Sequence, residues 1–272
     1  MEIPIPIEDS SPQPTRYALT VEYDGSQFNG WQAQIGVPTV QEALEAALSR
    51  VANHPVRVTG AGRTDTGVHA TGQVAHFESS SPRSLRSWLK GANTWLPQGA
   101  SILSVSPVRF DFHARFSATG RAYRYVIFNR PVAPTFLRGR VTWEYRPMDV
   151  SRMRAAAAFL VGRHDFNAYR AVGCQSESSI RELRRLRVSA SGRWIWVDAE
   201  AESFLQHMVR NIVGVLLAVG AGEKEATWAG EVLNSRDRRF GGVTAPPDGL
   251  YFVRASYPAP YELPTVPECR FW

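Results

Sequence analysis

Residues 60–70 form the stretch whose residue types are best suited to chemistry. The stretch reads Gly-Ala-Gly-Arg-Thr-Asp-Thr-Gly-Val-His-Ala, with three glycines framing Arg63 and Asp65. Glycine allows positive φ and close approach of a ligand, and a loop between two strands presents its side chains from a rigid base. A carboxylate near an arginine stays ionised, so Asp65 is suited to act as a nucleophile, a base or an electrostatic stabiliser.

Two other interpretations of this loop compete with the catalytic one. In the first, Asp65 is only a turn residue that accepts a hydrogen bond from the Gly67 N–H, and the loop taken alone favours this interpretation. In the second, residues 65–67 are the Asp-Thr-Gly triplet of an aspartic protease, which needs two such carboxylates. The sequence has no second Asp-Thr-Gly or Asp-Ser-Gly. A symmetric dimer would supply one, but it would leave the basic second half unexplained.

The elements expected to hold this loop alternate between strand and helix. A strand pattern begins at Tyr17, and Thr39 is a suitable N-cap for a helix whose apolar residues recur at helical spacing. The pattern then predicts a glycine-rich loop between two short strands, followed by a helix and a strand. These predictions cover a helix at 40–51, strands at 56–59 and 74–77, the loop at 60–71, a helix at 85–94 and a strand at 102–108.

The second half repeats an order of helix followed by strands. Residues 122–128 alternate so that Tyr123 and Tyr125 share one face of a strand and Arg124 and Val126 share the other. The shared order weakly indicates a duplicated α+β unit with its boundary near 109–122. The remaining predictions are a loop at 130–147, a helix at 148–161, paired strands at 180–188 and 194–202 around Ser191-Gly192, and helices at 204–219 and 225–234.

The positive charge is concentrated in the second half of the chain. The net charge is +6, and residues 1–118 carry 9 basic and 10 acidic side chains, whereas residues 119–272 carry 22 and 15. Residues 109–187 alone hold 16 arginines against 6 acids. A one-sided positive field attracts polyanions, nucleic acid first. Arginine makes up 29 of the 31 basic residues; composition bias explains that ratio better than function does.

Cysteine usage, the first residues and the apolar runs all favour a soluble cytoplasmic protein. Cys174 and Cys269 are too far apart in sequence for a metal motif and too few for a disulfide framework. The proline-rich residues 1–15 lack the basic start of a signal peptide and are expected to form a disordered leader. The longest apolar run, 212–222, is shorter than the ~20 residues of a membrane helix. His69 and His76 have no cysteine nearby and suit structural roles, so no metal site is expected.

The whole set of motifs resembles the TruA family of tRNA pseudouridine synthases. The loop at 60–70 is the most specific of them, and the others occur in the family's order over nearly the whole chain. They are Asp24-Gly25 with 28–32, then 73–77, 112–118, 121–125, 162–166, 204–214 and 244–251.

The resemblance implies a fold and a reaction. The expected fold is α+β, with two related mixed helix-strand halves, 16–118 and 119–272, that form one continuous, mainly antiparallel sheet with a central cleft. The expected reaction isomerises uridine to pseudouridine in the anticodon stem-loop of tRNA, at tRNA positions 38, 39 and 40, without cofactor or metal. The family also implies a homodimer that binds tRNA. The target base is stacked in a helix and must be flipped out.

The resemblance also assigns roles to individual residues. Asp65 matches the family's nucleophile; whether it attacks C6 of uracil or C1′ of ribose is left open. Arg63 matches the arginine that helps to hold the displaced nucleotide, and Tyr123 the tyrosine that packs on the flipped base, where its hydroxyl is suited to moving the C5 proton. Arg210 matches the arginine that pairs with the catalytic carboxylate. Leu250 lies in a segment similar to the apolar wall of the uracil pocket.

Two broader expectations complete the sequence interpretation. The loop at 28–32 is expected to touch RNA, and arginines of 109–187 are expected to contact phosphates, although no single one is nominated. The alternative function is a non-catalytic tRNA-binding protein with a decayed active site. The intact set of Arg63, Asp65, Tyr123 and Arg210 argues against this alternative.

Overall fold

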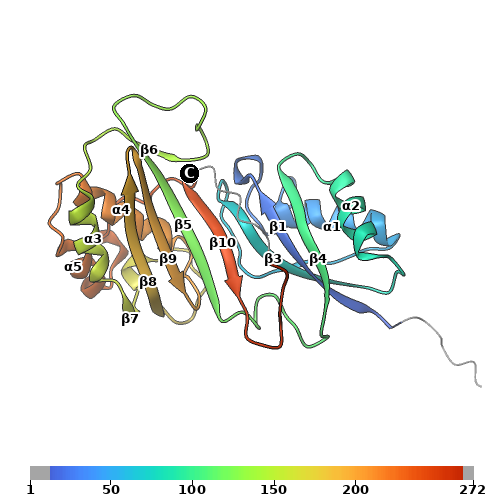
Figure 1. The fold of residues 1–272 in the computed structure, drawn as a ribbon. Coiled ribbons are helices and arrows are strands. Elements are labelled where there is room, and N and C mark those ends of the chain that lie inside the picture. Colours follow the sequence, from blue (N-terminus) through green and yellow to red (C-terminus); the bar gives the residue numbers. More distant parts are fainter. Residues whose placement is uncertain (1–12, 266–272) are drawn as a thin grey trace, which may run out of the picture.

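The computed structural model describes residues 13–265, and a single ten-stranded sheet runs through both halves of the chain (Figure 1). The strand order is β4-β1-β3-β10-β5-β9-β8-β7, with β2 paired to β3 and β6 paired to β5. All pairs are antiparallel except β3–β10 and β5–β6. The strands are β1 Thr15–Tyr23, β2 Thr59–Gly60, β3 His69–Ser79, β4 Ala100–Val108, β5 Gly120–Asn129, β6 Thr142–Glu144, β7 Gly162–Asp165, β8 Ile180–Ser191, β9 Trp194–Ala201 and β10 Leu250–Ser256.

The helices form two groups, one beside each half of the sheet, and Figure 1 shows both groups behind the strands. In the N-terminal half α1 contacts α2, and in the C-terminal half α3, α4 and α5 contact one another. The predicted α+β fold with one continuous, mainly antiparallel sheet is confirmed. The helices are α1 Val40–Ala52, α2 Leu85–Trp95, α3 Val150–Ala158, α4 Met208–Gly220 and α5 Trp228–Ser235, and the 3-10 turns are η1 Gly25–Gln27, η2 Asn167–Tyr169 and η3 Arg238–Phe240.

Each half of the sheet has its own hydrophobic core, and each core includes one buried residue from the other half of the chain. The N-terminal core packs β1 and β3 against α1 and α2 and also takes in Phe252 from β10. The C-terminal core packs β5, β8 and β9 against α3, α4 and α5 and also takes in Val68 from the loop before β3. The strand β10 lies between β3 and β5, so the end of the chain joins the two halves.

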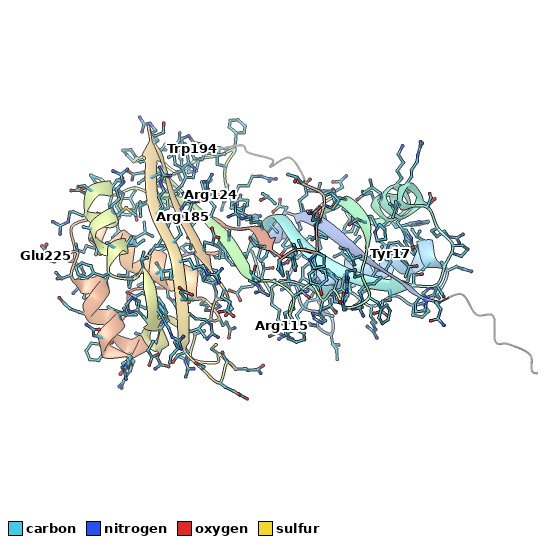
Figure 2. The ribbon with its side chains drawn as sticks, turned by 60° about the horizontal axis from the view of Figure 1, so that its bottom comes forward. Tyr17, Arg115, Arg124, Arg185, Trp194 and Glu225 are labelled. Carbon is cyan, nitrogen blue, oxygen red and sulfur yellow. The ribbon has the colours of Figure 1, made fainter. Side chains whose placement is uncertain are left out.

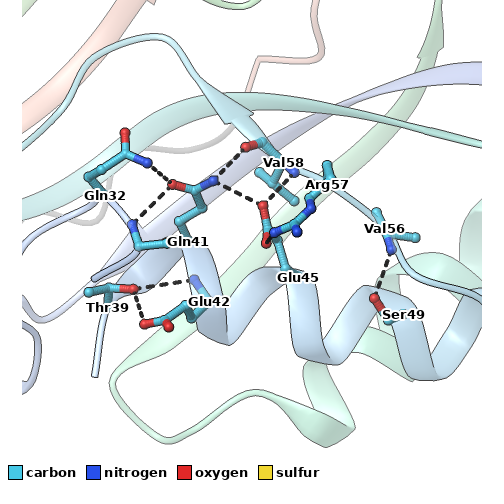
Figure 3. A network of polar contacts seen from close by, with 10 residues as sticks. Gln32, Thr39, Gln41, Glu42, Glu45, Ser49, Val56, Arg57 and Val58 are labelled. Atoms are coloured by element: carbon cyan, nitrogen blue, oxygen red, sulfur yellow. Dashed lines mark hydrogen bonds and ion pairs between the residues drawn. The ribbon is translucent and has the colours of Figure 1, made fainter. Parts of the chain in front are cut away.

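Most elements form where the sequence pattern predicts them. Thr39 is the N-cap of α1, as predicted: its hydroxyl accepts from the Glu42 N–H at 3.4 Å and donates to the Glu42 carboxylate at 2.6 Å (Figure 3). The alternation in β5 is also confirmed, because Tyr125 lies in the helix-covered core and Val126 in a separate cluster on the opposite face.

Other element predictions are wrong. Residues 56–58 are not part of a strand; only β2, Thr59–Gly60, pairs with β3. The glycine-rich loop ends at Val68 rather than at residue 71, because β3 begins at His69, and α4 begins at Met208 rather than at 204. The strand β10 has no counterpart in the predictions, because pairing with two distant strands, not local periodicity, stabilises it. Thr15 belongs to β1 although it was assigned to the leader; residues 1–12 of that leader lie outside the described residues.

The sheet face of the C-terminal half that points away from the helices carries ion-paired side chains beside the small apolar cluster that contains Val126 and Phe128. Arg124 on β5 forms a bidentate ion pair with Asp198 on β9, at 2.6 and 2.9 Å. Figure 2 labels Arg124, Arg185 and Trp194 on the strands of this half. Alternation along these strands therefore puts the large apolar core under the helices and leaves a mixed charged and apolar face on the other side.

Candidate active site

A cleft of about 960 Å³ lies where the two halves meet, and residues from both halves line it. It opens on the side of the sheet that carries the helices, because the Tyr123 side chain in the cleft is on the same face of β5 as Tyr125 in the helix-covered core. All five residues nominated from the sequence line this cleft: Arg63, Asp65, Tyr123, Arg210 and Leu250.

Backbone hydrogen bonds anchor the loop that carries Asp65 to the sheet behind it. The Ala61 N–H donates to Val74 O of β3 at 2.7 Å. The fully buried Gln73 side chain accepts from the Gly62 N–H and donates to the Gly62 carbonyl, at 3.3 and 2.7 Å. The Thr64 hydroxyl meets the Tyr23 hydroxyl at 2.9 Å. The loop is therefore rigid up to the residue before the carboxylate.

The turn at Asp65 is closed by the backbone, which leaves the side chain available. The Val68 N–H donates to the Asp65 carbonyl at 3.1 Å. Within residues 13–265, no hydrogen bond joins the Gly67 N–H to the Asp65 carboxylate, so the competing turn-residue interpretation is not what the structure shows. Gly67 has φ +82°, and a Cβ there would lie 2.8 Å from Pro247 Cγ, so only glycine fits this turn.

A second glycine lets the 28–32 segment pack against the same loop. Gly30 has φ +87°, and a Cβ there would lie 2.7 Å from the Thr64 carbonyl oxygen. The next residue, Trp31, donates its N–H to that same carbonyl at 3.0 Å. The 28–32 segment, expected to touch RNA, therefore forms the cleft wall beside Asp65.

The start of α4 supplies the two partners of Asp65. Arg210 Nη1 lies 3.6 Å from Asp65 Oδ2, and His207 Nε2 lies 3.4 Å from the same oxygen. The positive end of the helix dipole points the same way. Asp65 Oδ1 has no hydrogen-bond or ion-pair partner in the described part of the chain, and the side chain is 30% exposed. The carboxylate is thus contacted on one oxygen and open on the other.

Arg210 is fixed by a second contact. Its Nε donates to the Ala245 carbonyl at 2.8 Å, and its side chain is only 14% exposed. The pairing of Arg210 with Asp65 expected from the family resemblance is therefore present in the geometry.

Tyr123 lies in the cleft, where two phenylalanines pack against its ring and its hydroxyl faces no hydrogen-bond partner among the described residues. Phe204 and Phe252 each pack edge-on to the ring with centroids 5.1 Å away. The hydroxyl makes no hydrogen bond to any residue between 13 and 265. Burial raises the pKa of this hydroxyl, and the nearby Asp65 charge acts in the same direction. Tyr123 therefore offers the cleft a ring edge and a neutral hydroxyl, not a phenolate.

Arg63 and Leu250 complete the nominated set. Arg63 is exposed at the mouth of the cleft and has no ion pair with another described residue. Leu250 is buried and contributes apolar surface to the cleft wall.

His207 belongs to this site and sequence reasoning missed it. It is the N-cap of α4 in a left-handed conformation, with φ 60°, which is costly for a residue other than glycine. The spacing of three residues between His207 and Arg210 was a usable signal, because residues so spaced share a helix face.

Arg121 does not fit the expectation that arginines of 109–187 contact phosphates. Its guanidinium donates to four backbone carbonyls that bound the cleft, at distances from 2.5 to 3.3 Å. An arginine committed in this way is a structural clamp between the catalytic loop and its neighbours. The four carbonyls belong to Ala61, Arg115, Ala118 and Glu202.

The sequence as a whole matches the family described as tRNA pseudouridine synthase, over residues 19–117 and 156–258. The chain belongs to the tRNA pseudouridine synthase family. As a member of this family it is an isomerase that acts on tRNA. The structure and the family assignment thus agree on the pseudouridine synthase fold anticipated from the sequence.

Curated relatives cover almost the full chain. The tRNA pseudouridine synthase A of Alcanivorax borkumensis is 55% identical over 95% of this chain and 97% of its own. That of Pseudomonas aeruginosa is 52% identical over 96% and 92%, and that of Coxiella burnetii (strain Dugway 5J108-111) is 50% identical over 93% and 97%. A crystal structure of a Cbf5-Nop10-Gar1 complex aligns with a TM-score of 0.33 and 13% identity, over 74% of this chain and 45% of that chain.

Residues 13–265 contain no group of three or more His, Cys, Asp or Glu side chains placed to hold a metal ion. In the same range no helix is both long and apolar enough to cross a bilayer.

Proposed function

We propose that this pseudouridine synthase isomerises uridine in the anticodon stem-loop of tRNA, at tRNA positions 38, 39 and 40, with Asp65 as the nucleophile. The observation that carries the proposal is the state of the Asp65 carboxylate. One oxygen lies near Arg210 and His207, and the other is unpartnered in a cleft of about 960 Å³. An ionised, accessible carboxylate on a rigid loop is the arrangement that nucleophilic catalysis requires.

The chemistry needs no external reactant. The C1′–N1 bond breaks, the uracil turns within the cleft, and C1′ forms a bond with C5. C5 then loses its proton and N1 gains one, so atoms and charge balance. While the sugar and the base are apart, Asp65 would be bonded covalently either to C1′ of the ribose or to C6 of the uracil. Arg210 would hold the Asp65 carboxylate in place before attack through its contact with Oδ2.

The other nominated residues serve the displaced nucleotide. Tyr123 is proposed to pack against the flipped uracil, because its ring is clamped by two phenylalanines and its hydroxyl is free. Arg63, exposed at the cleft mouth, is proposed to hold the displaced nucleotide through its phosphate. Leu250 is proposed to form the apolar wall against the base. Base flipping of this kind costs a few kcal/mol of unstacking, which such contacts repay.

The positive C-terminal half supports binding of the tRNA backbone. Neutralised phosphates release counterions, so tRNA affinity is expected to fall steeply as salt rises. We also propose a homodimer in the cytoplasm, as the family resemblance implied; a sedimentation measurement tests the dimer directly.

Tritium release from tRNA labelled at uridine C5 tests the proposed reaction. The wild type should release tritium and Asp65→Asn should not, while both bind tRNA within a few-fold of each other. Release by both proteins would remove Asp65 from the nucleophile's role. Release by neither, with tRNA still bound at moderate salt, would favour the non-catalytic binding protein.

A further inference from the structure

A chain of hydrogen bonds behind the cleft wall fixes the orientation of one amide that faces the cleft. The chain runs from Glu45 through Gln41 to Gln32, and Figure 3 shows it along α1. Gln32 lines the cleft and follows Trp31, whose N–H bonds the Thr64 carbonyl next to Asp65. Gln32 therefore lines the same cleft as Asp65, next to a residue that is bonded to the Asp65 loop.

The buried carboxylate of Glu45 orients Gln41. Glu45 Oε1 accepts from the Val58 N–H at 3.0 Å and from Gln41 Nε2 at 2.9 Å. Gln41 Nε2 also donates to the Val58 carbonyl at 3.2 Å. Since both partners of Gln41 Nε2 are acceptors, only the amide nitrogen of Gln41 fits on this side.

Gln41 in turn orients Gln32. Gln41 Oε1 accepts from the Ala33 N–H at 3.1 Å and from Gln32 Nε2 at 2.7 Å. The Gln32 nitrogen must therefore face Gln41, and its Oε1 points away from the network in Figure 3. Within residues 13–265, Gln32 Oε1 has no hydrogen-bond partner. Gln32 thus presents one acceptor of fixed position and one remaining N–H.

An amide of fixed polarity can distinguish uracil from cytosine. Uracil carries an N3–H donor beside carbonyl acceptors, which matches a carboxamide oxygen next to its N–H. Cytosine carries an N3 acceptor beside an amino donor, which is the reverse arrangement. A freely rotating glutamine would flip to suit either base. To flip, Gln32 would have to break its hydrogen bond to Gln41. Without the flip, cytosine would place its N3 acceptor against the Gln32 oxygen and its amino group against the Gln32 N–H.

We propose that the Gln32 amide hydrogen-bonds to the Watson–Crick edge of the uracil in the cleft. Gln41 and Glu45 fix which side of that amide accepts and which side donates. This rests on the proposed function, in which the target uridine enters the cleft beside Asp65. Enzymes that flip a base read it through its Watson–Crick edge, and a site built to pair with one pattern rejects the other because polar groups are left unpaired.

The test compares hairpin RNAs of an anticodon arm that carry uridine or cytidine at the target position. Binding is measured at fixed salt in an Asp65→Asn background, so that phosphate contacts cancel in the ratio of the two dissociation constants. The parent should favour uridine by about tenfold or more, as expected of one bidentate base contact. Gln32→Leu should bring the ratio close to one, and in the otherwise wild-type enzyme it should lower kcat/KM for tRNA by a similar factor.

Two further variants separate recognition from folding. Gln41→Met frees Gln32 to flip, so the ratio should fall while uridine RNA still binds. Gln27→Leu removes an exposed glutamine outside the cleft and should change neither quantity. A ratio near one in the parent, or one that survives Gln32→Leu and Gln41→Met, would overturn the inference. Loss of tritium release in the wild type would instead overturn the proposed function.

Discussion

Two clusters of the same three residue types lie near the two ends of the glycine-rich loop. In the cleft, Asp65 lies 3.4 Å from His207 and 3.6 Å from Arg210. Outside the residues that line the cleft, the Asp24 carboxylate lies 3.3 Å from His69 and 3.2 Å from Arg140.

The two clusters differ in how completely the carboxylate is satisfied. Asp24 also accepts from the Ser26 hydroxyl and N–H, at 2.6 and 3.1 Å, and its side chain is 16% exposed. Burial opposes its ionisation, but the Ser26 hydrogen bonds and the neighbouring His69 and Arg140 outweigh burial and lower the pKa of Asp24. Asp65 has only its two longer contacts, both on one oxygen.

The histidines differ in the same way. His69 is almost fully buried, stacks on Tyr251 at 4.7 Å, and accepts the Gly25 N–H at Nδ1. His207 is 30% exposed to the cleft. Residue types alone therefore do not distinguish the two aspartates. They differ in that the partners of Asp65 leave one carboxylate oxygen accessible, which is what the proposed catalytic role requires.

The largest expected effect follows from removing the accessible carboxylate. Asp65→Asn should lower kcat by about 10⁴-fold or more, as loss of a nucleophile does, because the amide cannot form the covalent adduct. The melting temperature should stay within a degree or two of the wild type, since Asp65 contributes few contacts. Tritium release and thermal unfolding measure the two quantities. A large fall in melting temperature would place Asp65 with Asp24 as a structural residue.

A buried histidine of β3 should control stability at low pH. Burial lowers the pKa of His76 on β3 to about 4, and the neighbouring charges of His113 and Arg16 act in the same direction against Glu78. Below about pH 6.5, His76 is therefore protonated in the unfolded chain but still neutral in the folded chain. The free energy of unfolding consequently decreases as the pH falls towards 4, by about 2–3 kcal/mol for this group. Urea unfolding between pH 7 and 4 measures the slope. His76→Gln should flatten it; an unchanged slope would show that other groups carry it.

The cationic partner of the open carboxylate should matter for turnover. Arg210→Gln should lower kcat/KM by about 10- to 100-fold, because a positioned charge next to a reacting group is worth roughly that much. Arg210→Lys should recover part of the loss. Arg140→Gln is the matched change at the other cluster and should leave kcat/KM within a few-fold. Equal losses in the two variants would mean that the two clusters do not differ in the way argued here.

The Asp24 carboxylate, which is fully occupied by hydrogen bonds and ion pairs, should matter for stability. Asp24→Asn keeps the shape and an acceptor for Ser26 but removes the charge that faces His69 and Arg140. We expect a loss of about 1–2 kcal/mol in the free energy of unfolding, the range for hydrogen bonds to charged groups. Turnover at a temperature well below the melting point should remain close to that of the wild type. Chemical denaturation and tritium release together separate the two effects.

The smallest effect is expected for the second partner of Asp65. His207→Gln keeps a donor near Oδ2 and should lower kcat by only a few-fold, since Arg210 already supplies a fixed charge. His207→Gly relieves the left-handed backbone and should raise thermal stability by a few tenths to about 1 kcal/mol. A loss of kcat for His207→Gln as large as the loss of activity for Arg210→Gln would show that His207 is a catalytic residue and not a positioning residue.

Local sequence determined the elements and the position of the glycine-rich loop. The apolar spacing of 40–51 and the Thr39 cap gave α1, and alternation in 122–128 gave β5, because both signals act within one element. The glycines at 60, 62 and 67 marked the loop, and Asp65 within it stood out by residue type. The nominated residues Tyr123, Arg210 and Leu250 came from a family resemblance, since nothing local separates them from ordinary core or surface positions.

Tertiary structure decided which of these groups meet. β10 pairs with β3 and β5 across the middle of the sheet and brings Leu250 into the cleft, and no local pattern predicts such long-range pairing. The start of α4 places His207 and Arg210 within 4 Å of a loop more than a hundred residues earlier in the chain. The availability of Asp65, the saturation of Asp24 and the fixed amide of Gln32 depend on hydrogen bonds between segments, so they follow from packing and not from the sequence of any one segment.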